Sequence, residues 1–167
     1  MEYKYGIIED KSFLDSLSGY KKIVLFGYTK TGKVKIARTI SEHLGIKLIK
    51  TDDYQHIDFR QAVYTMLDEI SKLERANMPF IIEGVQCARI LRKGLETGTF
   101  TPDLVIRTSC NTNTIEYCYR QDGEADKIKG ALSFNKGIEK IYTEYVDMLE
   151  NVPYLTPRFI TINTSLI

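Results

Sequence analysis

Short apolar runs alternate along this chain with longer segments in which apolar residues recur every three or four positions. Short runs of this kind are typical of strands buried on both faces, and the longer segments are typical of amphipathic helices. The predicted strands lie near residues 23–26, 46–50, 80–84, 103–108 and 158–163. The predicted helices lie near residues 33–44, 58–77, 86–96, 111–121 and 134–152. The alternation predicts an α/β fold in which helices cover both faces of a five-stranded parallel sheet.

Residues 1–20 form a lead-in before the first core strand. Residues 4–8 predict a short strand, and Ser12 is expected to cap a short helix that ends at Gly19. We expect this lead-in to cover one edge of the sheet.

The first core strand is followed by a glycine and lysine pattern that is typical of phosphate binding. The predicted loop consists of Gly27, Tyr28, Thr29, Lys30, Thr31, Gly32, Lys33 and Val34. Glycines let successive backbone N–H groups turn toward a polyphosphate, and the helix that follows points its positive end at the same anion. The lysine then reaches the outer phosphates. A strand before the loop and a helix after it make the match much stronger than the bare pattern.

Val34 stands where such loops have a serine or threonine whose hydroxyl binds Mg²⁺. Thr31 lies in the loop and not on the first helical turn, so its hydroxyl cannot take the same place. Two alternatives stay open. Either carboxylates and water hold Mg²⁺, or the loop binds a phosphate compound and turns it over slowly or not at all.

Acidic residues follow two further predicted strands. Asp52 and Asp53 come directly after the second strand, and Glu83 ends the third. In an open α/β sheet, ligands gather at the carboxyl ends of the strands. An aspartate there can accept the proton of an attacking hydroxyl or bind Mg²⁺ through water. The alternative is that Asp53 or Asp58 caps the next helix.

Basic residues lie near the same predicted edge. Arg89 is close to the start of the helix after the third strand, where it can bind a phosphate or hydroxyl of an acceptor. Arg92 and Lys93 are predicted to be solvated surface charges. Arg120 opens a polar, lid-like stretch, about residues 120–131, that is suited to closing over a nucleotide. Acids alternate with bases in that stretch, so an ordinary solvated face is the alternative.

Composition and charge narrow the function further. With 167 residues, we expect one domain with a real core. A net charge of +1 gives no bulk attraction to nucleic acid or to a membrane surface. The start of the chain lacks a signal pattern and no run approaches the roughly eighteen apolar residues of a membrane span, so we expect a cytoplasmic protein. Cys87, Cys110 and Cys118 show no paired spacing, which indicates reduced thiols and not a zinc site.

Four stretches together resemble the small P-loop kinases, the group of nucleoside and nucleoside-monophosphate kinases. They are the loop GYTKTGKV, the acids of TDDY, the strand end IIEG, and Arg120 before a long C-terminal helix. The resemblance covers about residues 21–165. It implies a sheet with strand order 2-3-1-4-5, ATP as the phosphoryl donor and Mg²⁺ as the cofactor.

The same resemblance implies a role for each matching residue. Lys33 would bind the β and γ phosphates, and Asp53 or Asp52 would face the acceptor hydroxyl. Glu83 would assist the acceptor or the metal, with Mg²⁺ held through water by Asp52 and Glu83. Arg120 would act as the lid arginine. The single lid arginine is a departure, because such enzymes usually have several.

The sequence therefore favours an ATP-dependent phosphotransferase that acts on a small acceptor, with a nucleoside or nucleotide preferred. The paired acids favour a hydroxyl acceptor, whereas a monophosphate acceptor calls for several arginines, which Arg60, Arg89 and Arg107 can supply. This choice stays open, as do ATP against GTP and the oligomeric state. A polynucleotide 5′-hydroxyl is a lesser option, because the chain is not basic.

The alternative function is a regulatory or partner-binding P-loop protein that binds a nucleotide or another phosphate ligand with little or no turnover. Val34 supports this alternative. Lys33, the paired acids and Glu83 speak against it, since a pocket kept only for packing has no need of buried charge.

Overall fold

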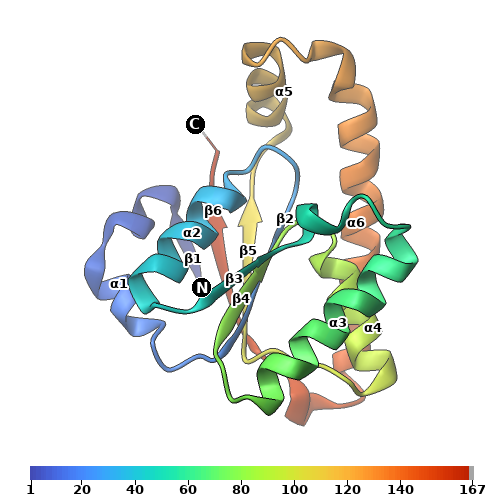
Figure 1. Cartoon of the computed structure of the whole chain (residues 1–167). Coiled ribbons are helices and arrows are strands. Elements are labelled where there is room, and N and C mark those ends of the chain that lie inside the picture. The colour runs from blue at the N-terminus through green and yellow to red at the C-terminus, as the bar shows by residue number, and fades with distance from the viewer. Residues whose placement is uncertain (166–167) are drawn as a thin grey trace.

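The computed structural model describes residues 1–165, and its centre is one parallel sheet of six strands (Figure 1). The strands are β1 (Glu2–Lys4), β2 (Lys22–Gly27), β3 (Lys47–Lys50), β4 (Phe80–Glu83), β5 (Leu104–Ser109) and β6 (Arg158–Asn163). Their order across the sheet is β1-β6-β5-β2-β4-β3. The five predicted strands are β2 to β6, and they follow the order 2-3-1-4-5. The sixth strand, β1, was not counted in the predicted sheet.

The lead-in covers one sheet edge, as expected, but by a different local structure. Residues 2–4 pair with residues 161–163 of β6, and residues 5–9 form a 3-10 helix instead of continuing the strand. The N-cap of α1 (Lys11–Ser16) is Asp10 and not Ser12. Asp10 has an extended backbone, and its carboxylate accepts hydrogen bonds from the N–H groups of Ser12 and Phe13. The carboxylate two residues earlier therefore takes the capping role.

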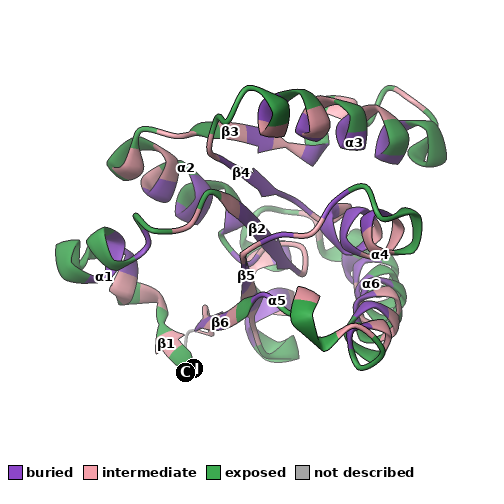
Figure 2. Ribbon diagram, turned by 90° about the horizontal axis from the view of Figure 1, so that it is seen from below, coloured by how far each residue is buried: buried purple, intermediate pink, exposed green. Residues whose placement is uncertain are grey.

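Helices cover both faces of the sheet and are buried on the side that faces it (Figures 1 and 2). One face carries α1 and α2 (Lys33–Leu44), and the other carries α3 (Phe59–Arg75), α4 (Cys87–Thr97) and α6 (Ile128–Leu149). Alternate residues of β2 enter the two cores. Val24 and Phe26 pack toward α3, α4 and α6, while Ile23 and Leu25 pack toward α1 and α2. This burial on both sides explains why residues 23–26 of the strand are all apolar.

The lid-like stretch is largely helical. α5 (Thr112–Gln121) and the first half of α6 stand above the carboxyl edge of the sheet (Figure 1), joined by a turn and a 3-10 helix at Ala125–Lys127. α6 begins six residues before the predicted start near residue 134. Ile128 and Ala131 form a small apolar cluster with Ile115 and Tyr119 of α5, and this burial extends the helix.

Two glycines let strand ends approach each other closely at this edge. A Cβ atom on Gly27 would lie 1.7 Å from the Oγ1 atom of Thr108, and one on Gly84 would lie 1.8 Å from the Oγ1 atom of Thr51. Gly84 also has a φ of 137°, which side chains rarely tolerate. These approaches bring the ends of β3, β4 and β5 around the loop that follows β2. Among residues 1–165, no helix has the length and apolar character needed to cross a bilayer.

Candidate phosphate-binding site

The loop between β2 and α2 turns sharply through left-handed backbone conformations. Lys30 has a φ of 59°, and Gly32, the N-cap of α2, has a φ of 74°. Within the described residues, no side chain caps the first turn of α2. The N–H groups at the start of this helix are therefore available to an anion, and the helix dipole favours negative charge there.

Lys33, at the first position of α2, is buried and only 8% exposed. Its Nζ atom donates a hydrogen bond to the backbone oxygen of Tyr28, within the loop. Burial lowers the pKa of Lys33, and the nearby Glu83, Cys87 and Asp52 partly offset this effect. The loop thus holds a poorly solvated ammonium group that an additional anion would stabilise.

The hydroxyl groups of the loop are arranged as expected from the sequence. Thr31 donates a hydrogen bond of 2.7 Å to the backbone oxygen of Tyr28 and lies 2.8 Å from the hydroxyl of Thr108. Val34 is 40% exposed on the first turn of α2. The Thr31 hydroxyl is therefore used inside the loop, and Val34 offers no oxygen for a metal ion.

Acidic residues lie beside Lys33 at the carboxyl edge. Glu83 is 2% exposed and lies in register with Lys50 at the end of β3. Burial raises the pKa of Glu83, Lys33 lowers it, and Asp52 raises it. Lys33, Asp52 and Glu83 are thus close enough to influence one another's charge.

Asp52 and Asp53 are exposed on a 3-10 helix, Thr51–Tyr54, directly after β3. The helix cap on α3 is Asp58, whose side chain accepts a hydrogen bond of 3.0 Å from the N–H of Arg60. The sequence indicated Asp53 or Asp58 as the cap of this helix. Because Asp58 is the cap, the side chain of Asp53 does not have this role and stays available at the sheet edge.

Protein ligands for a metal ion are few. Residues 1–165 contain no group of three or more histidine, cysteine, aspartate or glutamate side chains that could hold a metal. Asp52 and Glu83 are the neighbouring carboxylates. This donor set fits Mg²⁺ bound mainly by phosphate oxygens and water, which is the usual way Mg²⁺ binds at nucleotide sites.

The lid-like stretch brings acids to the loop. Lys30 binds Asp122 and Glu124, with distances of 2.5 and 2.9 Å from its Nζ atom to their oxygens. Lys127 and Lys30 together lower the pKa of Glu124 to about 2. Arg120 is exposed on the last turn of α5, and no hydrogen bond or ion pair joins it to the loop among the described residues.

Two residues of α6 that the sequence analysis did not single out also hold the loop. Asn135 accepts a hydrogen bond of 3.3 Å from the N–H of Thr29 through Oδ1. Glu139 accepts one of 2.9 Å from the hydroxyl of Tyr28, and it forms an ion pair of 2.5 Å with Arg107. Arg107 is thus engaged with α6. The contacts of Asn135 with Thr29 and of Glu139 with Tyr28 join residues more than 100 positions apart, so no local pattern indicates them.

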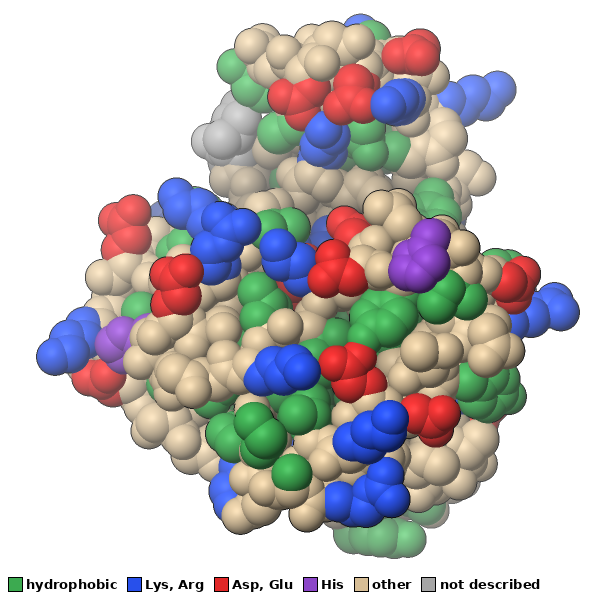
Figure 3. Space-filling view, in the orientation of Figure 1, with side chains coloured by type: hydrophobic (Ala, Val, Ile, Leu, Met, Phe, Trp, Pro, Cys, Tyr) green, Lys and Arg blue, Asp and Glu red, His purple; other side chains and the backbone are tan. Residues whose placement is uncertain are grey.

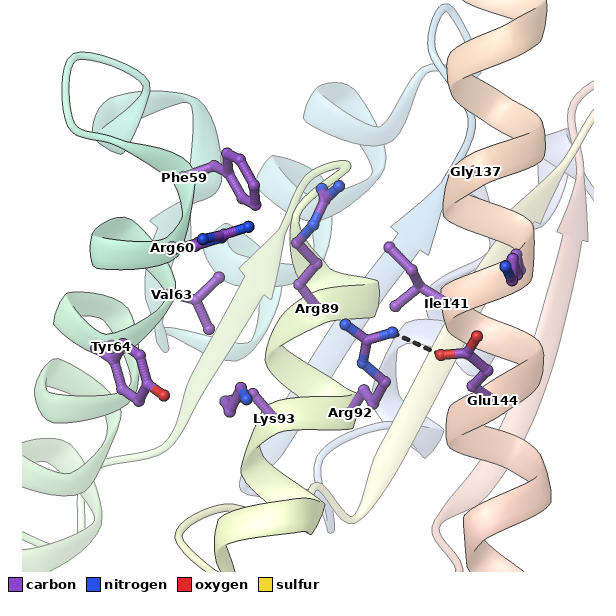
Figure 4. A pocket seen from close by; sticks show the side chains of 11 residues that line it. Phe59, Arg60, Val63, Tyr64, Arg89, Arg92, Lys93, Gly137, Ile141 and Glu144 are labelled. Atoms are coloured by element: carbon purple, nitrogen blue, oxygen red, sulfur yellow. Dashed lines mark hydrogen bonds and ion pairs between the residues drawn. The ribbon is translucent and has the colours of Figure 1, made fainter.

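A groove lies between α3, α4 and α6, with a cavity of about 500 Å³ (Figure 4). The guanidinium groups of Arg89 and Arg60 lie 5.0 and 5.6 Å from the centre of the Phe59 ring. Arg92 and Lys93, which the sequence predicts to be solvated surface charges, also line this groove. Elsewhere, on the face shown in Figure 3, acidic and basic side chains are interspersed.

Comparisons with known proteins concern the fold. No protein-family model matches the sequence, and no curated protein matches it. Among solved structures, deoxyadenosine kinase from M. mycoides with dCMP and dCDP is 19% identical, with a TM-score of 0.48 over 84% of this chain and 88% of that one. The same kinase with dCTP is 16% identical, with a TM-score of 0.46 over 86% and 90%. Shikimate kinase from Bacteroides thetaiotaomicron is 17% identical, with a TM-score of 0.36 over 84% and 85%.

The chain's own strand order, the loop after its central strand and the helix that starts at Lys33 define a parallel α/β fold with a P-loop-like connection after the central strand. All three TM-scores are below 0.5, so we base the function proposed below on the chain's own geometry.

Proposed function

We propose that the chain is an ATP-dependent phosphotransferase that transfers the γ-phosphoryl group to a small acceptor of the nucleoside or nucleotide type. The main support is Lys33, a buried ammonium at the uncapped start of α2, beside the buried carboxylate of Glu83. Residues 1–165 show no ion pair at Lys33. Burying such a cation is unfavourable unless an anion joins it, and the loop is shaped for a polyphosphate.

In this proposal, the loop and the first turn of α2 bind the β and γ phosphates through backbone N–H groups. Lys33 leaves the carbonyl of Tyr28 and binds the same phosphates. Asp53 or Asp52 accepts the proton of the acceptor hydroxyl as the new bond to phosphorus forms and the bond to the leaving ADP oxygen breaks. Catalysis is then mostly positioning and charge neutralisation, with no covalent intermediate.

Asp52 and Glu83 would hold Mg²⁺ through water, and the metal, when bound, would neutralise charge on the phosphates. Arg89 would bind the acceptor, since its guanidinium extends from α4 into the groove beside Phe59 (Figure 4). Arg120 lies on the exposed side of α5, so a role as the lid arginine requires α5 to move toward the loop.

The test is calorimetric titration of ATP into the protein, with and without Mg²⁺, for the wild type and Lys33→Ala. Loss of a charge-assisted contact to phosphate is expected to weaken binding by about 2 kcal/mol, or roughly 30-fold. Lys35→Ala is the matched control, because Lys35 is exposed on the same helix, two residues away. Failure of ATP to bind in either condition, or equal binding by Lys33→Ala, would refute the proposal.

A phosphate-binding protein with little or no turnover is the second candidate, and the exposed Val34 supports it. The two candidates differ in whether the site holds Mg²⁺ and in whether ATP is consumed. Product formation from labelled ATP and a panel of nucleosides and nucleotides separates them. ATP that binds, depends on Lys33 and is never consumed would favour the second candidate.

A further inference from the structure

The groove between α3, α4 and α6 has an excess of positive charge. Five basic side chains line it: Arg60, Arg89, Arg92, Lys93 and Lys140. Glu144 is the acidic residue that lines it, and Glu96 pairs with two of the cations from outside. Two carboxylates against five cations leave three positive charges without a counterion. This excess stands in contrast to the net charge of +1 for the whole chain.

At one end of the groove, two guanidinium groups lie against one aromatic ring. Phe59, Arg60 and Val63 project from α3 toward α4, and Arg89 extends from α4 toward Phe59 (Figure 4). Within residues 1–165, neither Arg60 nor Arg89 pairs with an acid. Arg89 donates a hydrogen bond of 2.7 Å to Gln86. Burial and the nearby Arg92 lower the pKa of Arg89, and no carboxylate offsets these two effects.

One helical turn further along α4, Lys93 lies beside a second aromatic ring, and this lysine is paired with Glu96 at 3.1 Å. Lys93 follows Arg89 by four residues, a rise of about 6 Å, and its Nζ atom lies 6.0 Å from the centre of the Tyr64 ring. Lys140, on α6, lines the same cavity and has no acidic partner among the described residues. The side chain of Arg92 points toward α6, where it forms an ion pair of 2.6 Å with Glu144 (Figure 4). The groove thus has two cationic positions, each beside an aromatic ring.

The first of these positions is next to the candidate catalytic edge. Phe59 lines both the groove and a second cavity of about 270 Å³, which Thr51 and Asp52 also line. A ligand in the groove therefore has one end near the acids that follow β3.

We propose that this groove binds a small molecule with two anionic groups about one helical turn apart, one at Arg60 and Arg89 and the other at Lys93. A planar ring of the ligand packs against Phe59. The volume suits a ligand of nucleotide size. That this ligand is the phosphoryl acceptor rests on the function proposed above, whereas its binding does not.

The test is equilibrium binding of three matched probes: a nucleoside, its 5′-monophosphate and its 3′,5′-bisphosphate, each with all four RNA bases. Inorganic pyrophosphate is the probe without a ring. The Lys33→Ala protein is titrated, so that binding in the phosphate loop is weakened and contributes little. For at least one base, the bisphosphate is expected to bind about tenfold more tightly than the monophosphate, and the nucleoside most weakly.

Variants assign the two positions. Lys93→Gln is expected to weaken bisphosphate binding about tenfold and to change monophosphate binding less than about threefold. Arg89→Gln is expected to weaken both about tenfold. Lys72→Gln, an exposed charge on α3 outside the groove, is the matched control and should change neither. Thermal unfolding of each variant checks that it is folded.

The proposal is overturned if no probe binds, if no bisphosphate binds more tightly than its monophosphate, or if Lys93→Gln leaves bisphosphate binding unchanged. Pyrophosphate that binds as tightly as every bisphosphate would remove the role of the ring. The two proposals fail separately. If the wild type does not bind ATP but bisphosphate binding is intact and depends on Lys93, the phosphotransferase function alone is refuted. If ATP binds through Lys33 but no bisphosphate binds in the groove, the groove proposal alone is refuted.

Discussion

The close approach of Gly84 to Thr51 sets the geometry of the acidic edge, because it brings the residue before Asp52 against the residue after Glu83. Replacing Gly84 by alanine perturbs it in two ways. The φ of 137° becomes strained, and the new Cβ atom lies 1.8 Å from the Oγ1 atom of Thr51 and 2.9 Å from its Cβ atom. Backbone strain of this kind costs about 1–3 kcal/mol, and overpacking costs about the same again. We expect Gly84→Ala to lower the free energy of unfolding by about 4 kcal/mol.

A double-mutant cycle separates the two contributions. The Thr51 hydroxyl is buried and has no hydrogen-bond partner among the described residues, so Thr51→Ala alone is expected to change stability by less than about 1 kcal/mol. The double variant should recover about 1–2 kcal/mol relative to Gly84→Ala, because the closest clash is gone. Gly98→Ala is the matched control: its φ is 66° and nothing lies within 4 Å of a Cβ there. It should therefore cost only about 1 kcal/mol.

Urea unfolding at 25 °C, followed by circular dichroism, measures all four variants. In a chain of this length, a loss of about 4 kcal/mol also lowers the midpoint of thermal unfolding by roughly 10 °C. Equal stabilities of Gly84→Ala and the double variant would show that Thr51 is not the obstacle. A cost for Gly84→Ala no larger than that of Gly98→Ala would refute the close approach itself.

Two further predictions concern other parts of the structure. The Tyr145 hydroxyl is buried without a partner among residues 1–165, so Tyr145→Phe should stabilise the protein by about 1 kcal/mol in urea unfolding; a loss of stability would contradict this. Joint replacement of Asp122 by Asn and Glu124 by Gln should speed amide exchange across residues 119–127, whereas the control Asp126→Asn should not, because Asp126 does not bind Lys30. The pKa of Glu124 falls from 4.5 to about 2, so its stabilising effect is present above 4.5 and is lost as the pH falls toward 2; protection factors, taken relative to intrinsic exchange at each pH, that stay constant over this range would contradict the ion pairs.

The elements that the sequence predicted correctly are those whose signals are local. Residues 23–26 of β2 are an uninterrupted apolar run, Gly32 and Lys33 follow it at a fixed spacing, and α2 has apolar positions on one side. Each of these patterns is complete within about ten residues. The strand order was also predicted correctly, because the resemblance that implied it depends on these same segments.

What the sequence missed depends on contacts between distant segments. Asn135 and Glu139 look like ordinary polar positions of a helix, yet they bind the loop across more than 100 residues. The lid-like stretch was expected to bring Arg120 to the loop, but the fold brings Asp122 and Glu124 to Lys30. Charge alternation in that stretch gave no indication of which sign would face the loop.

The effect of Mg²⁺ on ATP binding separates the two candidate functions, because the carboxylate of Glu83 is buried at the site. Its charge opposes a bound polyphosphate, and Lys33 supplies a single positive charge in return. A divalent cation between carboxylate and phosphates converts this repulsion into attraction. The phosphotransferase therefore requires ATP to bind more tightly with Mg²⁺ than without it. A site that only binds phosphate compounds, with Val34 in place of a metal ligand, gains nothing from the metal. In that case, no interaction offsets the free-energy cost of burying the Glu83 carboxylate.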